Sequence, residues 1–291
     1  MTDSFYSIQD NDIIFPQPVK MRYTSKEFMC RINTFPDQKN RTILWHLGQN
    51  SYYLKFAGGS GVIIDPYLTD YCASGFTGTR TPRSRILPVM IEPEDINVET
   101  IFLTHSHCDH TDPFTISRLE NKVSIRFFAP WKATEVLRQN GIPEKNIHTV
   151  YPGEEITLNG YTVHVTFALA TDATDLTHAG YFFMPRSGGS FYNTGDTAAC
   201  MLLGQDLQYL KKNKNITVDV MAVCINGGYN NLSHWQAAEL AARIKPKFAI
   251  PAHYDVMPHN VQHPHMFKKS LSVLCSDVMY KKPEYYEEFI F

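Results

Sequence analysis

The sequence predicts an α/β fold in which two β-sheets pack face to face and helices cover their outer faces. Short β-type runs occur in both halves of the 291 residues, and helical patterns lie between them. Hydrophobic residues make up 43% of the chain and charged residues 19%, which is enough apolar material for a large core. Chains of this length and pattern commonly form one unit, so we expect a single domain over residues 1–291.

The first half begins with a leader, residues 1–40, that we expect to be rich in loops. Apolar and β-branched runs then predict four strands, at residues 42–47, 51–56, 61–64 and 100–103. Asp112 followed by Pro113 combines a good N-cap residue with proline at the first helical position, and so predicts a helix start. Residues 131–139 have helical periodicity and stop at an Asn-Gly pair.

The second half adds strands, two hairpins and a capped helix. Asn159-Gly160 predicts a tight turn between two strands, and a second hairpin turns at residues 187–189. Ser233 and Gln236 fit a capping box before an apolar helix. The strands expected here are residues 155–158, 161–167, 181–184, 218–224 and 248–252. The aromatic tail, residues 281–291, is expected to be an edge element or a contact in a homo-oligomer.

Composition and charge exclude several classes of function. The net charge of −2 gives no general attraction to nucleic acid, because neutralising phosphates takes concentrated Lys and Arg. No apolar run approaches the roughly 20 residues that span a bilayer, and residues 1–9 lack the layout of a signal peptide. The six cysteines show no paired spacing. We therefore expect a cytoplasmic protein with reduced thiols and no membrane span.

The segment Thr-His-Ser-His-Cys-Asp-His-Thr-Asp, residues 104–112, is the most informative pattern in the chain. Side chains two apart at the end of a strand point the same way, so His105 and His107 can converge on one ion. The following turn brings in Asp109 and His110, and the spacing allows two adjacent ions. Imidazole and carboxylate ligands suit Zn, Mn or Fe, whereas the lack of Cys or Met ligands argues against copper or an iron–sulfur cluster.

This motif resembles the His-x-His-x-Asp-His signature of the metallo-β-lactamase superfamily. Three further features of that superfamily follow in matching order: an Asp after an early apolar strand, a bridging carboxylate after a later strand, and a His at the end of a strand near the C-terminus. They are Asp65, Asp196 and His253. The resemblance covers about residues 43–265 and implies an αββα sandwich of mixed sheets. The metal ligands that it implies are His105, His107, Asp109, His110, Asp196 and His253.

One ligand of the superfamily pattern has two candidates in this sequence. The superfamily usually places another ligand, commonly His, between the His-rich motif and the bridging Asp. Asp172 and His178 lie in that interval, and either of them, or neither, could serve. Asp172 would make the site richer in oxygen and would favour Mn or Mg over Zn, whereas His178 could equally be a packing or surface residue. We expect one or two divalent metal ions, Mn or Zn.

Within the superfamily the chain is most similar to the L-ascorbate-6-phosphate lactonase group. The likeness rests on four short stretches: Trp45-His46-Leu47-Gly48, residues 105–113, Gly188-Gly189-Ser190 and Asn260-Val261-Gln262. It implies that a metal-bound hydroxide opens a sugar-acid lactone, such as a phosphorylated ascorbate-type lactone, by attack on its carbonyl carbon. Asp109 is expected to orient the hydroxide or to take up its proton.

A phosphorylated small-molecule substrate also needs cations to bind it. Arg80, Arg83 and Arg85 are candidates, because guanidinium groups grip phosphate bidentately, although a solvated basic loop would contain the same residues. Tyr229 and Asn230 follow the end of a strand, where they would line the pocket or form a turn.

Two other functions stay open at this point. The same metal core suits a metal-dependent phosphodiesterase acting on RNA or phospholipid, although the basic arm that nuclease relatives add is not evident. A non-catalytic metal-binding protein would also keep the fold, but the motifs are complete. Cys108 lies between two candidate ligands, and we expect its side chain to point away from them. Four other histidines are assigned no ligand role: His234, His259, His263 and His265.

Overall fold

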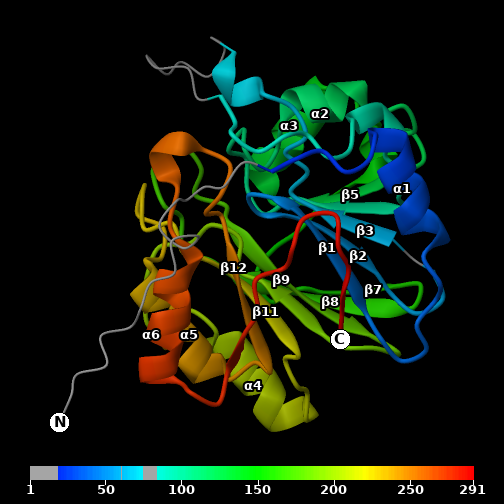
Figure 1. The fold of residues 1–291 in the computed structure, drawn as a ribbon. Helices are drawn as coiled ribbons and strands as arrows, with labels where there is room; N and C mark the ends of the chain where they lie inside the picture. Colours follow the sequence, from blue (N-terminus) through cyan, green and yellow to red (C-terminus); the bar gives the residue numbers. More distant parts are fainter. Residues whose placement is uncertain (1–18, 60, 75–83) are drawn as a thin grey trace.

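The computed structural model describes residues 19–59, 61–74 and 84–291, and this part of the chain forms two seven-stranded sheets packed face to face (Figure 1). The first sheet has the strand order β14-β1-β2-β3-β4-β5-β6, and the second has the order β13-β12-β11-β10-β9-β8-β7. Both sheets contain parallel and antiparallel pairs. Helices lie on the outer faces, so the predicted αββα sandwich is confirmed.

The strands follow the two halves of the chain, except that the last strand returns to the first sheet. The first sheet consists of β1 (Ile43–Gly48), β2 (Ser51–Lys55), β3 (Gly61–Ile64), β4 (Thr100–Phe102), β5 (Arg126–Ala129), β6 (Ile147–Thr149) and β14 (Phe289–Ile290). The second consists of β7 (Glu155–Leu158), β8 (Tyr161–Phe167), β9 (Ala179–Pro185), β10 (Phe191–Asn193), β11 (Val220–Cys224), β12 (Phe248–Ala252) and β13 (Met279–Tyr280).

The described helices divide between the two outer faces. The first sheet is covered by α1 (Ser25–Thr34), α2 (Pro113–Arg118) and α3 (Trp131–Gln139), and the second by α4 (Gln205–Lys214), α5 (His234–Ile244) and α6 (Pro264–Leu274). Short 3₁₀ turns are η2 (Tyr71–Ala73), η4 (Pro93–Asp95), η5 (Glu144–Asn146) and η6 (Pro258–Asn260). No helix in the described ranges is both long enough and apolar enough to cross a membrane.

Three apolar clusters hold the layers together. One lies between the sheets and includes Phe102, whose ring stacks on Phe128 at 4.7 Å and meets Tyr181 edge-on at 5.0 Å. The other two lie between each sheet and its helices. Central strands that are covered on both faces bury nearly every side chain, which explains their continuous apolar sequences.

The predicted local signals are confirmed where a cap or a turn defines them. Asn159-Gly160 joins β7 to β8, with Gly160 at the positive φ of +87° that such a turn requires. Helix α3 spans the predicted residues 131–139. Asp112 caps α2, because its carboxylate accepts a hydrogen bond of 2.9 Å from the backbone N–H of Phe114.

The prediction of a loop-rich leader was wrong for residues 25–34, which form α1. Thr24 and Glu27 make a capping box there, a signal that lies in the sequence and was overlooked. The apolar face of α1, with Phe28 and Ile32, is buried against the first sheet. The expectation that the tail forms an edge element is confirmed, because β14 pairs antiparallel with β1 at the edge of that sheet.

Helix α5 offers a direct test of the capping argument. Ser233 Oγ accepts a hydrogen bond of 3.3 Å from the backbone N–H of Gln236, whose side chain accepts one of 3.0 Å from the N–H of Ser233. We expect Ser233→Ala to lower the free energy of unfolding by about 1 kcal/mol. Urea denaturation measures this, with the exposed Ser272→Ala on α6 as the control, expected to change it by less than about 0.5 kcal/mol. Equal effects of the two substitutions would contradict the capping role.

The topology brings together the ends of several strands of both sheets at the site; "edge" here means the side of a sheet at which strands end. β1, β3 and β4 run in the same direction, because β2 is antiparallel to β1 and β3 whereas β4 is parallel to β3. The segments that follow these three strands therefore leave the first sheet at one edge. In the second sheet, β10, β11 and β12 are parallel and β9 is antiparallel to β10. The residues before β9 and after β10, β11 and β12 consequently share an edge as well.

Candidate metal centre

Seven histidine and aspartate side chains gather where these two edges meet. They form three overlapping groups whose ligand atoms lie within 4.8 Å of one another. The groups are His105 with His107 and His178; His105 with His110 and Asp196; and Asp109 with His110 and His253. The structure thus brings together all six residues of the predicted ligand set, and it adds His178.

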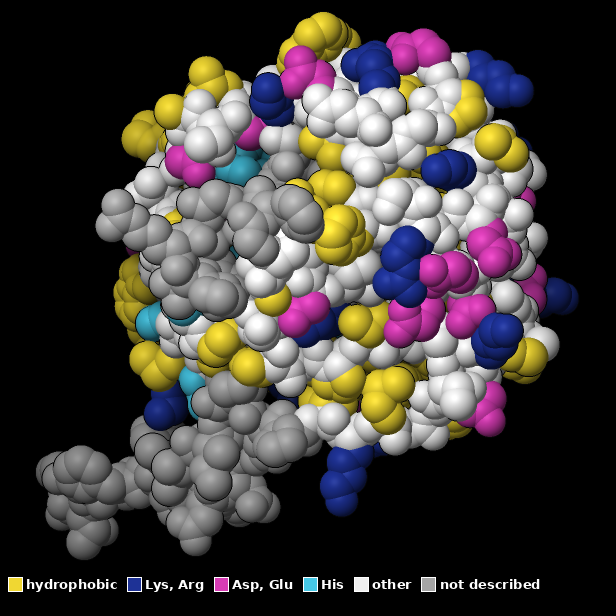
Figure 2. Space-filling model, turned by 90° about the horizontal axis from the view of Figure 1, so that it is seen from above, with side chains coloured by type: hydrophobic (Ala, Val, Ile, Leu, Met, Phe, Trp, Pro, Cys, Tyr) yellow, Lys and Arg dark blue, Asp and Glu magenta, His cyan; other side chains and the backbone are white. Residues whose placement is uncertain are grey.

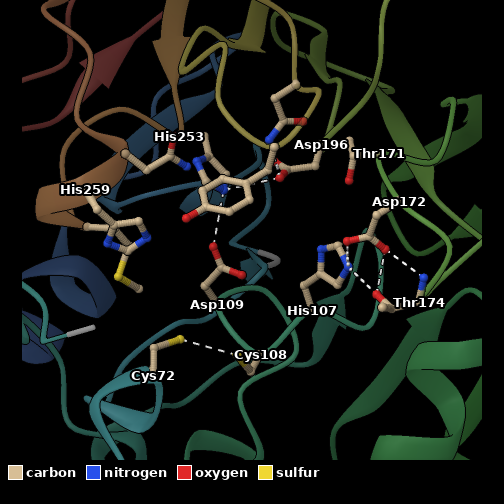
Figure 3. Close-up of a pocket in the computed structure, with 14 residues that line it drawn as sticks. Cys72, His107, Cys108, Asp109, Thr171, Asp172, Thr174, Asp196, His253 and His259 are labelled. Atoms are coloured by element: carbon tan, nitrogen blue, oxygen red, sulfur yellow. Dashed lines mark hydrogen bonds and ion pairs between the residues drawn. The ribbon is translucent and has the colours of Figure 1, made fainter. Parts of the chain in front are cut away.

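His178, rather than Asp172, completes the first group. His178 lies directly before β9 and is buried, and its ring stacks on that of His105 at 4.1 Å. Its Nδ1 is 2.9 Å from the backbone oxygen of Asp196, which turns Nε2 toward the cluster. The side chain of Asp172 is 43% exposed, and its Oδ2 lies 3.4 Å from Nε2 of His107, at the rim of the pocket (Figure 3).

Asp196 lies between the two ends of the cluster. Its Oδ1 is 3.4 Å from Nε2 of His110, and its Oδ2 is 3.3 Å from Nε2 of His253. Oδ2 of Asp109 is 3.2 Å from the same nitrogen of His253 (Figure 3). Asn231 donates a hydrogen bond of 2.6 Å to Oδ2 of Asp196 and fixes the orientation of this carboxylate.

The donor atoms fit a divalent cation. Within the described chain, Nε2 of His110, Nε2 of His178 and Oδ1 of Asp196 are buried without a hydrogen-bond partner. Burying such atoms unpaired is costly, and native structures avoid it unless the atoms serve a purpose. All three belong to the ligand groups, so a cation that accepts their lone pairs supplies the missing interaction.

The electrostatics also prepare these groups for metal. Burial lowers the pKa of His105 and of His178, which favours the neutral imidazole that binds metal. Burial lowers the pKa of His110, but the carboxylates of Asp196 and Asp109 outweigh burial and hold this pKa well above its usual value, so a cation that binds this ring displaces a proton. Burial raises the pKa of Asp196, but the charges on His253 and His110 lower it by more than burial raises it. The carboxylate therefore stays ionised.

A second layer of hydrogen bonds orients the ligands. Asp65 is fully buried, and its Oδ2 lies 2.8 Å from Nδ1 of His110, which directs Nε2 of that ring into the cluster. Asn50 donates to the same oxygen at 2.6 Å, and the backbone N–H of Thr104 donates to the other at 2.7 Å. Asp65 was identified from its motif, whereas Asn50 has no distinguishing sequence signal.

A pocket of about 300 Å³ lies over the cluster. Asp109, Asp196, His253 and His259 form part of its wall (Figure 3). Tyr229 also lines it, with its ring edge to face with that of His259 at 6.0 Å. The candidate Tyr229 therefore lines the pocket. Asn230 does not, because its amide donates a hydrogen bond of 2.8 Å to the backbone oxygen of Thr171 and holds the neighbouring loop.

Arg85, a predicted substrate-binding residue, is not among the residues that line the pocket. Its guanidinium donates to three backbone oxygens, those of Leu87 at 2.6 Å, Tyr67 at 2.9 Å and Thr69 at 3.1 Å. The group also lies 5.2 Å from the ring of Tyr67. Nε and Nη1 are thus engaged by backbone oxygens, whereas Nη2 is buried without a hydrogen-bond partner. Arg80 and Arg83, the other two candidates, lie outside the described residues.

Cys108, which was expected to point away from the ligands, belongs to none of the three ligand groups but does line the pocket. Cys108 lines the pocket together with Cys72, and the two sulfur atoms are 3.3 Å apart (Figure 3). The tight turn after His107 directs the Cys108 side chain along the pocket wall instead of outward. Both cysteines are free thiols in the structure.

Comparison with known proteins identifies the class. The family described as "Beta-lactamase superfamily domain" matches residues 61–254, well over half of the chain. The chain therefore belongs to the β-lactamase superfamily, and it is a metal-dependent hydrolase of the metallo-β-lactamase type. It is similar to a UPF0173 metal-dependent hydrolase of Thermoplasma acidophilum, with 25% identity over 232 residues, covering 79% of this chain and 90% of the relative.

Solved structures share the fold. Igni18, a metallo hydrolase from Ignicoccus hospitalis, superposes with a TM-score of 0.66 at 20% identity, covering 86% of this chain and 98% of that protein. An isothiocyanate hydrolase from Delia radicum gut bacteria gives 0.64 at 17% identity, covering 85% and 98%. The superposition includes nearly the whole length of both neighbours, so all three chains share the two-sheet architecture.

Proposed function

We propose that this hydrolase opens the ring of a small lactone, with a sugar-acid lactone of the ascorbate type as the first candidate. The observation that carries the proposal is the set of three overlapping ligand groups at the wall of a pocket of about 300 Å³. A volume of this size suits one small ring and not a polymer. On the face drawn in Figure 2, Lys and Arg alternate with Asp and Glu, so the described part of that face carries no continuous basic patch for nucleic acid.

We infer that His105, His107 and His178 hold one divalent ion and that Asp109, His110 and His253 hold a second, with Asp196 between them. The set contains five imidazoles and two carboxylates, a mixture that suits Zn or Mn. When bound, such an ion lowers the pKa of water from about 16 toward about 7 and polarises a carbonyl oxygen.

Side chains of the protein carry out proton transfer and substrate positioning. Asp109 faces the pocket and is ionised, because the charges on His110 and His253 lower its pKa although burial raises it. Its carboxylate accepts the proton of the attacking water or aligns that water with the carbonyl carbon. Tyr229 and His259 then restrict the ring of the substrate from the outer side of the pocket.

The pocket favours an uncharged ring. No Lys or Arg occurs among the described residues that line it, and Asp172 adds negative charge at its rim. A phosphate group on the substrate would need cations from elsewhere, so we place the unphosphorylated lactone ahead of the phosphorylated one. Binding of the phosphate by Arg80 and Arg83 would instead favour the phosphorylated lactone.

A substrate panel tests the proposal. The protein is purified without chelator, its metal content is measured, and it is offered an ascorbate-type lactone, its 6-phosphate, an isothiocyanate and a generic phosphodiester. We expect lactone hydrolysis that a chelator abolishes and that Mn or Zn restores. Hydrolysis of the phosphodiester alone, or of the isothiocyanate alone, would overturn the lactone assignment.

The assignment of His178 has its own test. We expect His178→Ala to weaken metal binding by at least about 100-fold, since even residues that only orient a ligand cost about 10–100-fold when removed. Asp172→Ala is the matched control, because Asp172 contacts His107 but belongs to none of the three groups. Competition with a fluorescent chelator measures both affinities. Stronger loss in Asp172→Ala than in His178→Ala would show that the first group is wrongly assigned.

A further inference from the structure

Gln49, in the turn between β1 and β2, has an unusual environment for a glutamine. It is buried, and its backbone has the left-handed φ of +55°, a conformation that a residue with a side chain keeps only where its surroundings hold it. Its N–H donates a hydrogen bond of 2.8 Å to Asp255, and its carbonyl oxygen accepts one of 2.9 Å from the N–H of His253. The backbone of Gln49 is thus tied to the segment that carries a candidate ligand.

The side chain of Gln49 reaches the metal centre itself. Its Nε2 is 2.7 Å from Oδ2 of Asp109 and 3.0 Å from Nε2 of His253. An ionised carboxylate only accepts hydrogen bonds, so the atom that contacts Asp109 must be the amide nitrogen and not the amide oxygen. One amide group therefore contacts two members of the cluster that come from opposite sheets.

Gln49 is held in turn by the C-terminal segment. The carboxylate of Asp255 accepts hydrogen bonds from the N–H of Gln49 and from the hydroxyl of Tyr285. Asp255 is buried, and the ring of His46 is 5.5 Å from that of Tyr285 with the two planes nearly parallel. A continuous chain of contacts thus leads from the last ten residues to Asp109.

We propose that Gln49 is a positioning residue that fixes the carboxylate of Asp109 relative to His253, and that Asp255 and Tyr285 anchor it. The inference rests on the role of Asp109 in the proposed function. An aspartate on a loop has two free torsions, and a hydrogen bond from a buried, anchored donor restricts them to one orientation. Gln49 itself contacts no reacting atom in this assignment.

Gln49→Leu tests the proposal, because leucine has a similar size and no donor. We expect kcat to fall about 10–100-fold on whichever panel substrate is hydrolysed, while KM stays within about twofold. We also expect release of metal to a chelator, measured without substrate, to become about 10–100-fold faster, since the segment of His253 loses a contact. Gln208→Leu, exposed on α4, is the control and should leave both rates unchanged.

A second variant keeps the test valid if leucine disturbs the fold. In Gln49→Glu the shape is retained, but a carboxylate oxygen replaces the donor next to Asp109, so kcat should fall further than in Gln49→Leu. Thermal unfolding of the metal-free proteins identifies a folding defect. Wild-type kcat in Gln49→Glu, a raised KM with unchanged kcat in Gln49→Leu, or wild-type metal release in both would overturn the proposal. Because metal release needs no substrate, failure of the lactone assignment is distinguishable from failure of this inference.

Discussion

Replacement of Asp109 by Asn is expected to lower kcat by about 10²–10⁴-fold, the usual contribution of a positioned acid or base, while the protein retains metal. The substitution preserves size and removes the negative charge that faces the pocket and the nearby rings of His110 and His253. Six other members of the cluster remain to hold metal. Steady-state kinetics on the best panel substrate, together with elemental analysis of the same samples, measures both quantities.

The control for this prediction is Asp172→Asn. Asp172 lines the same pocket and contacts His107, yet it is largely exposed and belongs to no ligand group. We expect its replacement to change kcat by less than about tenfold, because removing an exposed charge costs about 1 kcal/mol or less. Near-normal turnover in Asp109→Asn with full metal content would refute the assigned role of Asp109.

Asp65→Ala is expected to have the largest effect on stability, lowering the free energy of unfolding of the metal-free protein by about 3–5 kcal/mol. Asp65 is fully buried, accepts hydrogen bonds from Asn50 and Thr104, and faces the imidazole of His110, whose pKa is raised in part by this carboxylate. Its removal leaves these buried donors unpaired and a buried positive charge with one partner fewer.

Denaturation by urea in the presence of a chelator measures the effect of Asp65→Ala without any contribution from bound metal. Asp37→Ala serves as the control, since Asp37 is exposed and accepts a hydrogen bond of 3.2 Å from the N–H of Gly58. We expect the control to change stability by less than about 0.5 kcal/mol. A loss below about 1 kcal/mol in Asp65→Ala would mean that the buried network reorganises around the missing carboxylate.

The fold could be predicted where the signal is local. Turn residues such as Asn159-Gly160 and caps such as Asp112 and Ser233 act within a few positions of themselves, so the sequence alone defines them. The helix α1 was overlooked although Thr24 and Glu27 carry an equally local signal. The arrangement of the two sheets, in contrast, rested on the interleaving of strands and helices together with the family resemblance.

Only those site residues that lie in recognisable sequence motifs could be predicted. The choice between Asp172 and His178 depends on which residue lies directly before β9 and contacts the segment after β10, which short-range patterns do not specify. Gln49 contacts residues far along the chain, and nothing in its neighbours indicates this. Arg85 illustrates the converse, since a charged residue in a polar segment donates to backbone oxygens and does not line the pocket.

The division of the ligands between the two sheets has a mechanical consequence. His105 and His110 follow a strand of the first sheet, whereas His178, Asp196 and His253 adjoin strands of the second. A cation held among them is a cross-link between the halves of the sandwich, in addition to the apolar layer between them. The residues assigned to catalysis therefore also fasten the two halves, and only the correctly docked sandwich presents a complete coordination shell.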